Sequence, residues 1–586
     1  MGERRRGIDD SIRLRFQGTI HLKKYMDEKK ILNAKKTFMN PEDRPVWETL
    51  SRCAARMSRE ESHLKYLIAA DRRLEGFSLR RRGLFYDFSR QRVDRGVMES
   101  LFQLGRSLGV QERFRAMIRG ERVNMTENRA ALHTASRDFS RRPIIIDGGD
   151  VTPEIQESRE KIRRFANDVH EKRIVGSTGK PFKDIVVVGI GGSHFGTECV
   201  AKALEMFSIP GMRIHFLSSL SGCQFEKIVA AIHPEATLWA VISKSFKTVE
   251  TMANAQLAQS FMEQRVPDAA AHFVAITSAA DPQAGLGFSS HSFSVFDFIG
   301  GRYSVTSPAG GIPLSLFFGY DLFQRFLKGA HDMDLHAENA PPQENIPLIA
   351  ALISFWNTVF LNYGALGIIP YAAPLSGLCA HIRQLHMESL GKSVDIDGAA
   401  MNEPAGTVVF GEPGTNAQHS FFQLAHQGRG FPMEFIGIAT PWNQTYNGSF
   451  NGVSHHQELW ANLIAQPLAL AMGRPAHDPA RSFSGNRPSS TIIMDELTPE
   501  NMGRLLSFYE AKTVYEAFLW RINPFDQFGV ESGKKTAAGI RDEIRRRNED
   551  STGKNSKTGD LKTANPEIQS IEQFYIDMLF EKNRIL

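Results

Sequence analysis

Alternating strand and helix patterns between about residue 146 and residue 325 are the feature that most restricts the fold of this chain. Four short apolar runs, starting at residues 184, 213, 237 and 271, read DIVVVGI, RIHFLSS, TLWAVIS and AHFVAIT. Helical patterns such as FEKIVAAI and VETMANAQLAQSF stand between them. Buried parallel strands are short apolar runs rich in β-branched residues, and this alternation predicts a parallel sheet covered by helices.

The segments on either side extend the same fold class. Residues 1 to about 145 look mostly helical, with apolar residues at three-to-four spacing in HLKYLIAADRRL and GVMESLFQLGRSLGV. Long helical patterns and further apolar strands such as MEFIGIAT follow residue 325. We therefore predict an α/β chain with mainly parallel central sheets flanked by helices. Its predicted parts are an N-terminal helical part of a large domain (1–145), a small domain (146–325), a large α/β domain (326–541), and a polar segment with a C-terminal helical arm (542–586).

The polar part of that last segment, residues 542–570, has almost no large apolar side chains. Such a composition is typical of a flexible or loosely held segment. The final IEQFYIDMLFEKNRIL predicts an amphipathic helix that docks on the rest of the protein.

Composition excludes several classes of function. The net charge is only +5, and the basic runs near the N-terminus carry no nucleic-acid recognition motif, so we interpret them as solvated faces. The four cysteines form no C-x-x-C pair, which favours a reducing compartment over a disulfide framework or a thiolate zinc site. No signal-peptide pattern follows the N-terminal arginines.

One uncharged stretch, residues 346–379, is long enough to cross a membrane. Asparagine, glycine and proline interrupt it, and no second stretch of this kind occurs. We favour a buried helix, a turn at Gly364 and a short buried strand, LGIIPYAA, over a membrane span.

Two turns in the first α/β region are candidate ligand sites. GIGGSHFG (189–196) follows a predicted strand, so its glycines and the next helix N-terminus suit an anion, although it matches neither a dinucleotide fingerprint nor a P-loop. SKSFKTVET (243–251) places hydroxyls and Lys244 at a second strand end, and ligands of open α/β sheets bind outside such ends. Together they would suit a monophosphate; alternatively, the hydroxyls are a helix N-cap cluster.

Other candidate residues are ambiguous one by one. Glu388, in RQLHMESLGKS, is either a solvated helix-face glutamate or a base for chemistry, and the local sequence does not decide. Taken singly, Arg302, His419 and Lys534 could equally be a surface arginine, a hydrogen-bonded structural histidine and a solvated lysine. No grouping of histidine, cysteine and acidic residues has good metal-ligand spacing, and no nucleophile elbow occurs.

Taken together, the motifs resemble those of the phosphoglucose isomerase family. The resemblance runs in the family's order from about residue 80 to about residue 540. Its most specific parts are GERVNMTENRAALHTASR, VVVGIGGSHFG, SKSFKTVETMANA, DFIGGRYSVTSPAG, HMESLGK, GEPGTNAQHSFFQLAHQG and INPFDQFGVESGKK. It implies two sugar-isomerase-type (SIS-like) α/β domains, the small one inserted into the large one. It also implies the interconversion of D-glucose 6-phosphate and D-fructose 6-phosphate by ring opening and proton transfer through a cis-enediol.

Roles for individual residues follow from the same resemblance. Glu388 matches the base that moves a proton between C1 and C2, Arg302 the cation that stabilises the enediolate, and His419 and Lys534 the residues linked to ring opening. The matched substrate contacts are Gly192, Ser193, Ser243, Lys244, Ser245, Thr248, Gln384 and Gln527. A homodimer with His419 contributed across the interface is implied, as are a cytoplasmic location and a reaction without metal or organic cofactor. Neither nucleic acid nor membrane is an expected partner.

The chain departs from the family pattern at a few positions. His194 stands where aspartate is usual, Lys247 and Ser245 where threonines are usual, and Leu390 where asparagine follows MES. The stretch containing Ser221 replaces one that commonly carries asparagine and aspartate. Two alternatives therefore stay open: an isomerase that also accepts mannose 6-phosphate, and a non-catalytic sugar-phosphate sensor.

Overall fold

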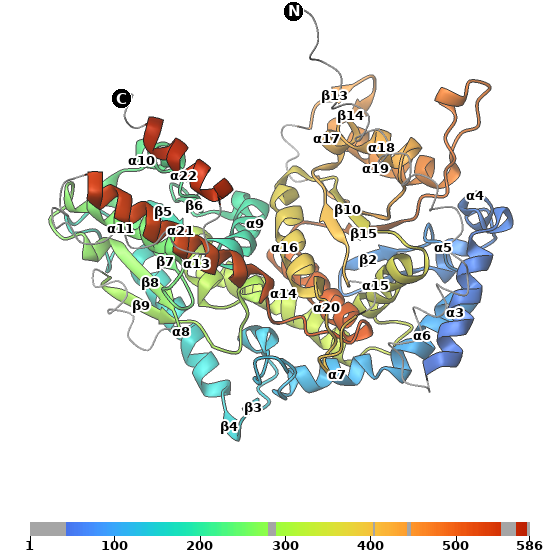
Figure 1. Ribbon diagram of the computed structural model, residues 1–586, viewed down its shortest axis with the longest axis horizontal. Helices are drawn as coiled ribbons and strands as arrows, with labels where there is room; N and C mark the ends of the chain where they lie inside the picture. Colours follow the sequence, from blue (N-terminus) through green and yellow to red (C-terminus); the bar gives the residue numbers. More distant parts are fainter. Residues whose placement is uncertain (1–42, 279–288, 402–404, 442–446, 552–569, 583–586) are drawn as a thin grey trace, which may run out of the picture. The chain divides into compact units, whose positions relative to one another are not determined.

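The computed structural model describes residues 43–278, 289–401, 405–441, 447–551 and 570–582 (Figure 1). Its contacts divide the chain into two compact units, one ending at Pro524 and the other beginning at Phe525. The first unit contains two large sheets, each accompanied by helices, which confirms the predicted α/β class. Among the described residues, no helix is long and apolar enough to span a membrane.

A five-stranded parallel sheet is built where the alternating pattern predicted it. Its spatial order is β6-β5-β7-β8-β9, and every neighbouring pair is parallel. The strands are β5 (Asp184–Val188), β6 (Arg213–Leu217), β7 (Thr237–Ile242), β8 (Phe273–Thr277) and β9 (His291–Ser294). The associated helices are α8 (Thr152–His170), α9 (Phe195–Ala203), α10 (Gly222–Ala231), α11 (Val249–Glu263) and α13 (Pro308–Phe318). The central strands β5 and β7 are buried along their whole length, as their continuous apolar sequences require.

The second large sheet is mixed and has six strands, in the order β1-β2-β15-β12-β10-β11. The strands β15, β12, β10 and β11 are parallel, whereas β2 pairs antiparallel with β15 and with β1. The strands are β1 (Ser78–Arg81), β2 (Leu84–Asp87), β10 (Ala365–Pro370), β11 (Val408–Phe410), β12 (Met433–Ile438) and β15 (Ser489–Met494). The two-stranded pairs are β3 (Ile145–Ile146) with β4 (Gly149–Asp150) and β13 (Ser449–Phe450) with β14 (Val453–Ser454).

Helices with clear start signals accompany this second sheet. Asn345 accepts a hydrogen bond from Leu348 N at the start of α15, and Thr498 accepts one from Asn501 N at the start of α20. The longer helices are α3 (Arg44–Met57), α6 (Arg95–Ser107), α7 (Val110–Ile118), α14 (Tyr320–Asn339), α15 (Ile346–Phe355), α16 (Leu378–Leu390), α19 (His455–Met472) and α20 (Pro499–Leu519). The short ones are α4 (Leu64–Leu67), α5 (Arg73–Gly76), α17 (Gly414–Gln418) and α18 (Phe422–Gln427).

Several expectations about local structure are confirmed. The uncharged stretch after residue 346 contains the buried helix α15, a π-helical turn over Trp356–Phe360 and the buried strand β10. MEFIGIAT contains β12, and the C-terminal pattern forms the helix α22 (Ser570–Lys582), whose docking stays a prediction.

The N-terminal part, predicted as mostly helical, contains the short helices α4 and α5 and also the hairpin β1–β2, which was not predicted. The expectation of a flexible or loosely held segment from residue 542 was wrong at its start. The polar segment predicted from residue 542 is helical as far as Ser551, because α21 (Gly529–Ser551) continues into it. Ion pairs one turn apart, such as Arg545–Asp542 and Arg546–Glu543, support this charged helix without a large apolar face. Residues 552–569 of that prediction lie outside the described residues.

Candidate active site

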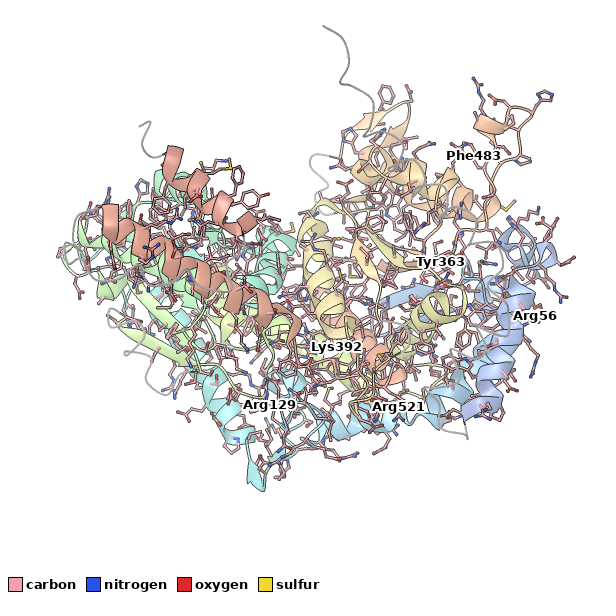
Figure 2. The ribbon with its side chains drawn as sticks, viewed as in Figure 1. Arg56, Arg129, Tyr363, Lys392, Phe483 and Arg521 are labelled. Carbon is pink, nitrogen blue, oxygen red and sulfur yellow. The ribbon has the colours of Figure 1, made fainter. Side chains whose placement is uncertain are left out.

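Glu388 lies in the last turn of α16 with its side chain about 30% exposed. Its Oε1 accepts a hydrogen bond from Gln384 Nε2 at 3.1 Å, one helical turn earlier. Its Oε2 lies 3.3 Å from Arg302 Nη1. Lys392, labelled in Figure 2, donates from Nζ to the backbone oxygen of Glu388 at 2.6 Å. Glu388 is therefore a half-buried, directionally held carboxylate and not a freely solvated glutamate.

Arg302 is the cation that faces this carboxylate. It lies on the short 3₁₀ helix Gly301–Tyr303, and its side chain is 1% exposed. Its Nε donates to Ser389 Oγ at 2.8 Å, and its Nη2 donates to the backbone oxygen of Pro524. The buried guanidinium thus has little freedom to move, which suits a fixed positive charge beside a reacting group.

The glycine-rich turn after β5 packs directly on this pair. A Cβ placed on Gly192 would lie 2.2 Å from the carbonyl carbon of Gly301, and one on Gly191 would lie 3.1 Å from Gln384 Nε2. Ser304 Oγ also donates to the backbone oxygen of Gly192 at 3.4 Å. Glycine at position 192 lets the two backbones approach each other closely. The turn is therefore brought to the Arg302–Glu388 pair by backbone contact.

The hydroxyl-rich turn after β7 is at the same edge of the sheet, because β5 and β7 are parallel neighbours. Ser243 is buried and donates from Oγ to Thr248 Oγ1 at 3.5 Å, while Ser245 is exposed and accepts from Lys247 N at 3.4 Å. Thr248 is the N-cap residue of α11. The structure thus brings both predicted turns together at one end of the five-stranded sheet.

Lys244 belongs to the same turn, but its ammonium group is already engaged. Its Nζ donates to the backbone oxygens of Asp297 and Ile299, at 2.7 and 3.3 Å. Burial, followed by the charge of Arg129, lowers the pKa of Lys244. Lys244 therefore ties the hydroxyl-rich turn to the segment that precedes Arg302.

The remaining predicted residues lie in other elements. His419 is exposed and lies immediately after α17, in an element separate from those that carry Glu388 and Arg302. Gln527 precedes α21, and Lys534 is exposed on that helix; both belong to the unit that begins at Phe525.

The residues that depart from the family pattern have defined surroundings. His194 is buried, and its Nε2 lies 3.2 Å from Glu198 Oε2, while Lys202 pairs with the other oxygen of that carboxylate. The hydrogen bond from His194 is the largest cause that lowers the pKa of Glu198, to about 2. Leu390 is fully buried against Ala405, Ala517 and Ile522.

Two residues around Arg302 were not among the predicted site residues. Ser389 is fully buried and accepts from Arg302, and Tyr303 places its hydroxyl 2.9 Å from Ser389 Oγ. Their only sequence signal was their position inside the motifs MES and GGRYS. Within the described part of the chain, no three histidine, cysteine or acidic residues form a group that could hold a metal ion.

Comparisons with known proteins identify the family to which this chain belongs. A family model described as phosphoglucose isomerase matches residues 87–561. A glucose-6-phosphate isomerase of Desulfosudis oleivorans is 52% identical, with 92% of this chain and 98% of that protein covered. A cytosolic glucose-6-phosphate isomerase of Arabidopsis thaliana is 39% identical, with 83% and 90% covered. A crystal structure of a glucose-6-phosphate isomerase from Chlamydia trachomatis superposes with a TM-score of 0.80 at 33% identity, covering 87% of this chain and 96% of that one.

Proposed function

Since this chain belongs to the phosphoglucose isomerase family, we propose that Glu388, Arg302, His419 and Lys534 carry out its catalysis. The protein is an aldose–ketose isomerase that interconverts D-glucose 6-phosphate and D-fructose 6-phosphate, a reaction of glycolysis and gluconeogenesis. The observation that carries the assignment of residues is the 3.3 Å contact between Arg302 Nη1 and Glu388 Oε2, with Gln384 on the other carboxylate oxygen.

Glu388 acts as the base in this proposal. It removes the proton from C2 of the open-chain aldose and returns it to C1, so that the reaction passes through a cis-enediol. A positioned base contributes about 10²- to 10⁴-fold to such a step. The partial burial of Glu388 and the fixed hydrogen bond from Gln384 support this role, because both hold the carboxylate in one direction.

Arg302 stabilises the negative charge that develops on the substrate oxygens as the proton leaves carbon. A buried, preorganised cation lowers the barrier most when it need not reorient during the reaction. The low exposure of Arg302 and its three separate contacts, to Glu388, Ser389 and the Pro524 carbonyl, support this role.

The phosphate and sugar are held at the carboxyl end of the five-stranded sheet. The proposed contacts there are Gly192, Ser193, Ser243, Lys244, Ser245 and Thr248. The N-terminus of α11 and the hydroxyls just before it suit an anion. We assign Lys244 a supporting part, because its ammonium group already binds two backbone carbonyls. Gln384 and Gln527 are proposed as flanking contacts.

Ring opening is assigned to His419 and Lys534. Imidazole suits a proton shuttle because its usual pKa lies near neutrality. We propose that His419 completes the site of a partner subunit in a homodimer; its exposure supports this role, since an exposed ring is available to a second copy.

The division into a small domain (146–325) and a large domain remains a proposal, supported by the sheet β5–β9, which lies entirely within that range. A cytoplasmic location is proposed from the relatives named as cytosolic.

The proposal is tested with purified protein, fructose 6-phosphate, glucose-6-phosphate dehydrogenase and NADP. Production of NADPH that depends on the protein, together with its loss in Glu388→Gln, supports the assignment. A folded, dimeric protein without turnover would contradict it and favour the sugar-phosphate sensor. Parallel assays with mannose 6-phosphate separate a strict isomerase from one of broader scope.

A further inference from the structure

The proposed function leaves open what fixes the guanidinium of Arg302 in its buried position. Two hydroxyls outside the proposed substrate contacts surround it. Ser389, next to the proposed base on α16, accepts from Arg302 Nε at 2.8 Å. Tyr303, next to Arg302 in sequence, has its hydroxyl 2.9 Å from Ser389 Oγ. Ser389 is fully buried, and Tyr303 is 1% exposed.

These groups form a closed ring of hydrogen bonds. Tyr303 donates its hydroxyl proton to the Pro524 carbonyl at 3.4 Å, and Arg302 Nη2 donates to the same oxygen. Because Tyr303 has only one hydroxyl proton, Ser389 donates its own proton to Tyr303 and accepts from Arg302. The ring therefore runs from Arg302 through Ser389 and Tyr303 to the Pro524 carbonyl and back. Within it Arg302 donates from both Nε and Nη2, so the guanidinium plane is held by two of its nitrogens.

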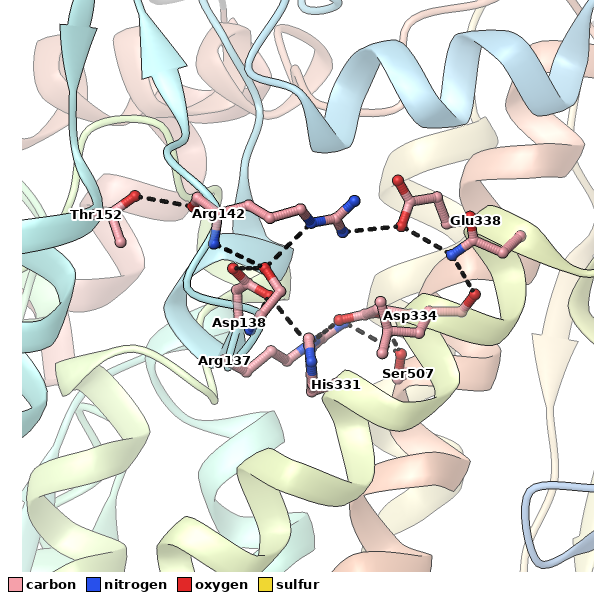
Figure 3. Close-up of polar contacts among 11 residues, drawn as sticks. Arg137, Asp138, Arg142, Thr152, His331, Asp334, Glu338 and Ser507 are labelled. Carbon is pink, nitrogen blue, oxygen red and sulfur yellow. Dashed lines mark hydrogen bonds and ion pairs between the residues drawn. The ribbon is translucent and has the colours of Figure 1, made fainter.

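The aromatic ring of Tyr303 packs against the buried ring of His133. His133 stacks on it with ring centroids 4.5 Å apart and an interplanar angle of 27°. His133 begins a 3₁₀ turn that ends at Arg137. Arg137 makes a bidentate ion pair with Asp334 on α14, with Nε–Oδ2 at 2.6 Å and Nη2–Oδ1 at 2.9 Å (Figure 3). Arg137 Nη1 also lies 2.6 Å from Glu510 Oε2 on α20. These ion pairs anchor the turn to α14 and α20, so the His133 ring that stacks on Tyr303 is held in place.

We propose that Ser389 and Tyr303 are positioning residues that hold the guanidinium of Arg302 against the carboxylate of Glu388. This inference rests on the proposed function, because it assigns a purpose to the position of Arg302. Neither hydroxyl needs to touch the sugar phosphate. Their effect reaches the reaction through Arg302, whose Nη1 is the atom that faces Glu388.

The test uses Ser389→Ala and Tyr303→Phe in the full-length protein. Tyr303→Phe keeps the ring that stacks on His133 and removes only the hydroxyl. It therefore tests the same hydrogen bonds even if Ser389→Ala does not fold. A displaced arginine is expected to lower kcat about 10- to 100-fold, with KM changed less than about twofold. Thermal unfolding is measured for each variant alongside the kinetics.

A matched pair of controls exists in the other sheet. Tyr86 and Ser490 are also buried and joined by a hydroxyl–hydroxyl hydrogen bond, of 3.3 Å, between β2 and β15. Tyr86→Phe and Ser490→Ala therefore remove the same chemical groups without touching the ring around Arg302. Wild-type kcat in these controls, beside reduced kcat in the first pair, supports the positioning role. Unchanged kcat in Tyr303→Phe and Ser389→Ala overturns it.

A double-mutant cycle asks whether the effect passes through Arg302. In an Arg302→Lys background, Ser389→Ala is expected to lower kcat no further, because lysine has no Nε–H for the serine to hold. The same factor of loss in both backgrounds would overturn the inference. If Arg302→Lys itself retains wild-type kcat, the proposed catalytic role of Arg302 is wrong. If Arg302→Lys has a reduced kcat while Ser389→Ala and Tyr303→Phe do not, only the positioning role of Ser389 and Tyr303 is wrong.

Discussion

Gly192 and Gly301 touch through their backbones: a Cβ placed on Gly192 would lie 2.2 Å from the carbonyl carbon of Gly301 and 2.6 Å from the nitrogen of Arg302. This contact joins the glycine-rich turn to the 3₁₀ turn that carries Arg302. No rotation of a flexible side chain relieves it, because the neighbouring atoms belong to the backbone. The position of Arg302 therefore depends on the absence of a side chain at residue 192.

Gly192→Ala is expected to lower kcat/KM by at least about 100-fold, because the backbones must separate and shift Arg302 from Glu388. The measurement is the coupled assay on folded protein, as judged by circular dichroism. Gly222→Ala is the control, since a Cβ there would meet nothing within 4 Å. Equal activity of the two variants would contradict the structural link.

Glu388→Gln is expected to reduce turnover by about 10²- to 10⁴-fold, because an amide cannot accept the proton from carbon. The side chain keeps its shape, so binding of 6-phosphogluconate, measured by calorimetry, should be largely unchanged. Glu263→Gln, an exposed position near the end of α11, is the control and should retain full activity. Loss of 6-phosphogluconate binding in Glu388→Gln would mean that Glu388 has a structural role.

Arg302→Lys is expected to lower kcat by about 10²- to 10³-fold. Lysine keeps the charge but cannot contact Glu388, Ser389 and the Pro524 carbonyl together, because those contacts use three nitrogens of a planar fork. Steady-state kinetics check this expectation. A change confined to KM would instead assign Arg302 to substrate binding alone.

Glu516→Gln should change how stability depends on pH. Glu516 is fully buried, and burial raises the pKa of its carboxyl to about 7, above the usual 4.5. Because the folded state holds this proton more tightly than the unfolded state, the contribution is fully present below pH 4.5 and is lost as the pH rises towards 7. The wild-type free energy of unfolding should therefore fall more steeply over this range than that of the variant, by on the order of 1 to 3 kcal/mol.

Urea denaturation of both proteins at pH 5, 6, 7 and 8 measures this difference. The curves of free energy against pH should diverge between pH 5 and 7 and run parallel above it. Parallel curves over the whole range would show that Glu516 ionises in the folded protein as it does in the unfolded chain.

Local patterns in the sequence were enough to predict much of the fold. The buried strands β5, β7 and β8 are largely apolar runs, and a run of this kind can be recognised from a few neighbouring residues. The hairpin β1–β2 was missed for the opposite reason. Both strands have only four residues, and β2 is fixed in the sheet by pairing with the distant strand β15. Tyr86 on β2 and Ser490 on β15 are 404 residues apart in sequence.

What the sequence by itself determined is the α/β class, the strands β5 to β8 with their intervening helices, and the motifs that contain Glu388, Arg302, His419 and Lys534. Only the tertiary structure decided that Arg302 and Glu388, 86 residues apart, meet; that Lys244 binds the carbonyls of Asp297 and Ile299; and that Ser389 and Tyr303 surround the guanidinium. Hydrophobic periodicity is a property of neighbouring residues, whereas these contacts depend on how distant backbones pack, down to the missing side chain of Gly192.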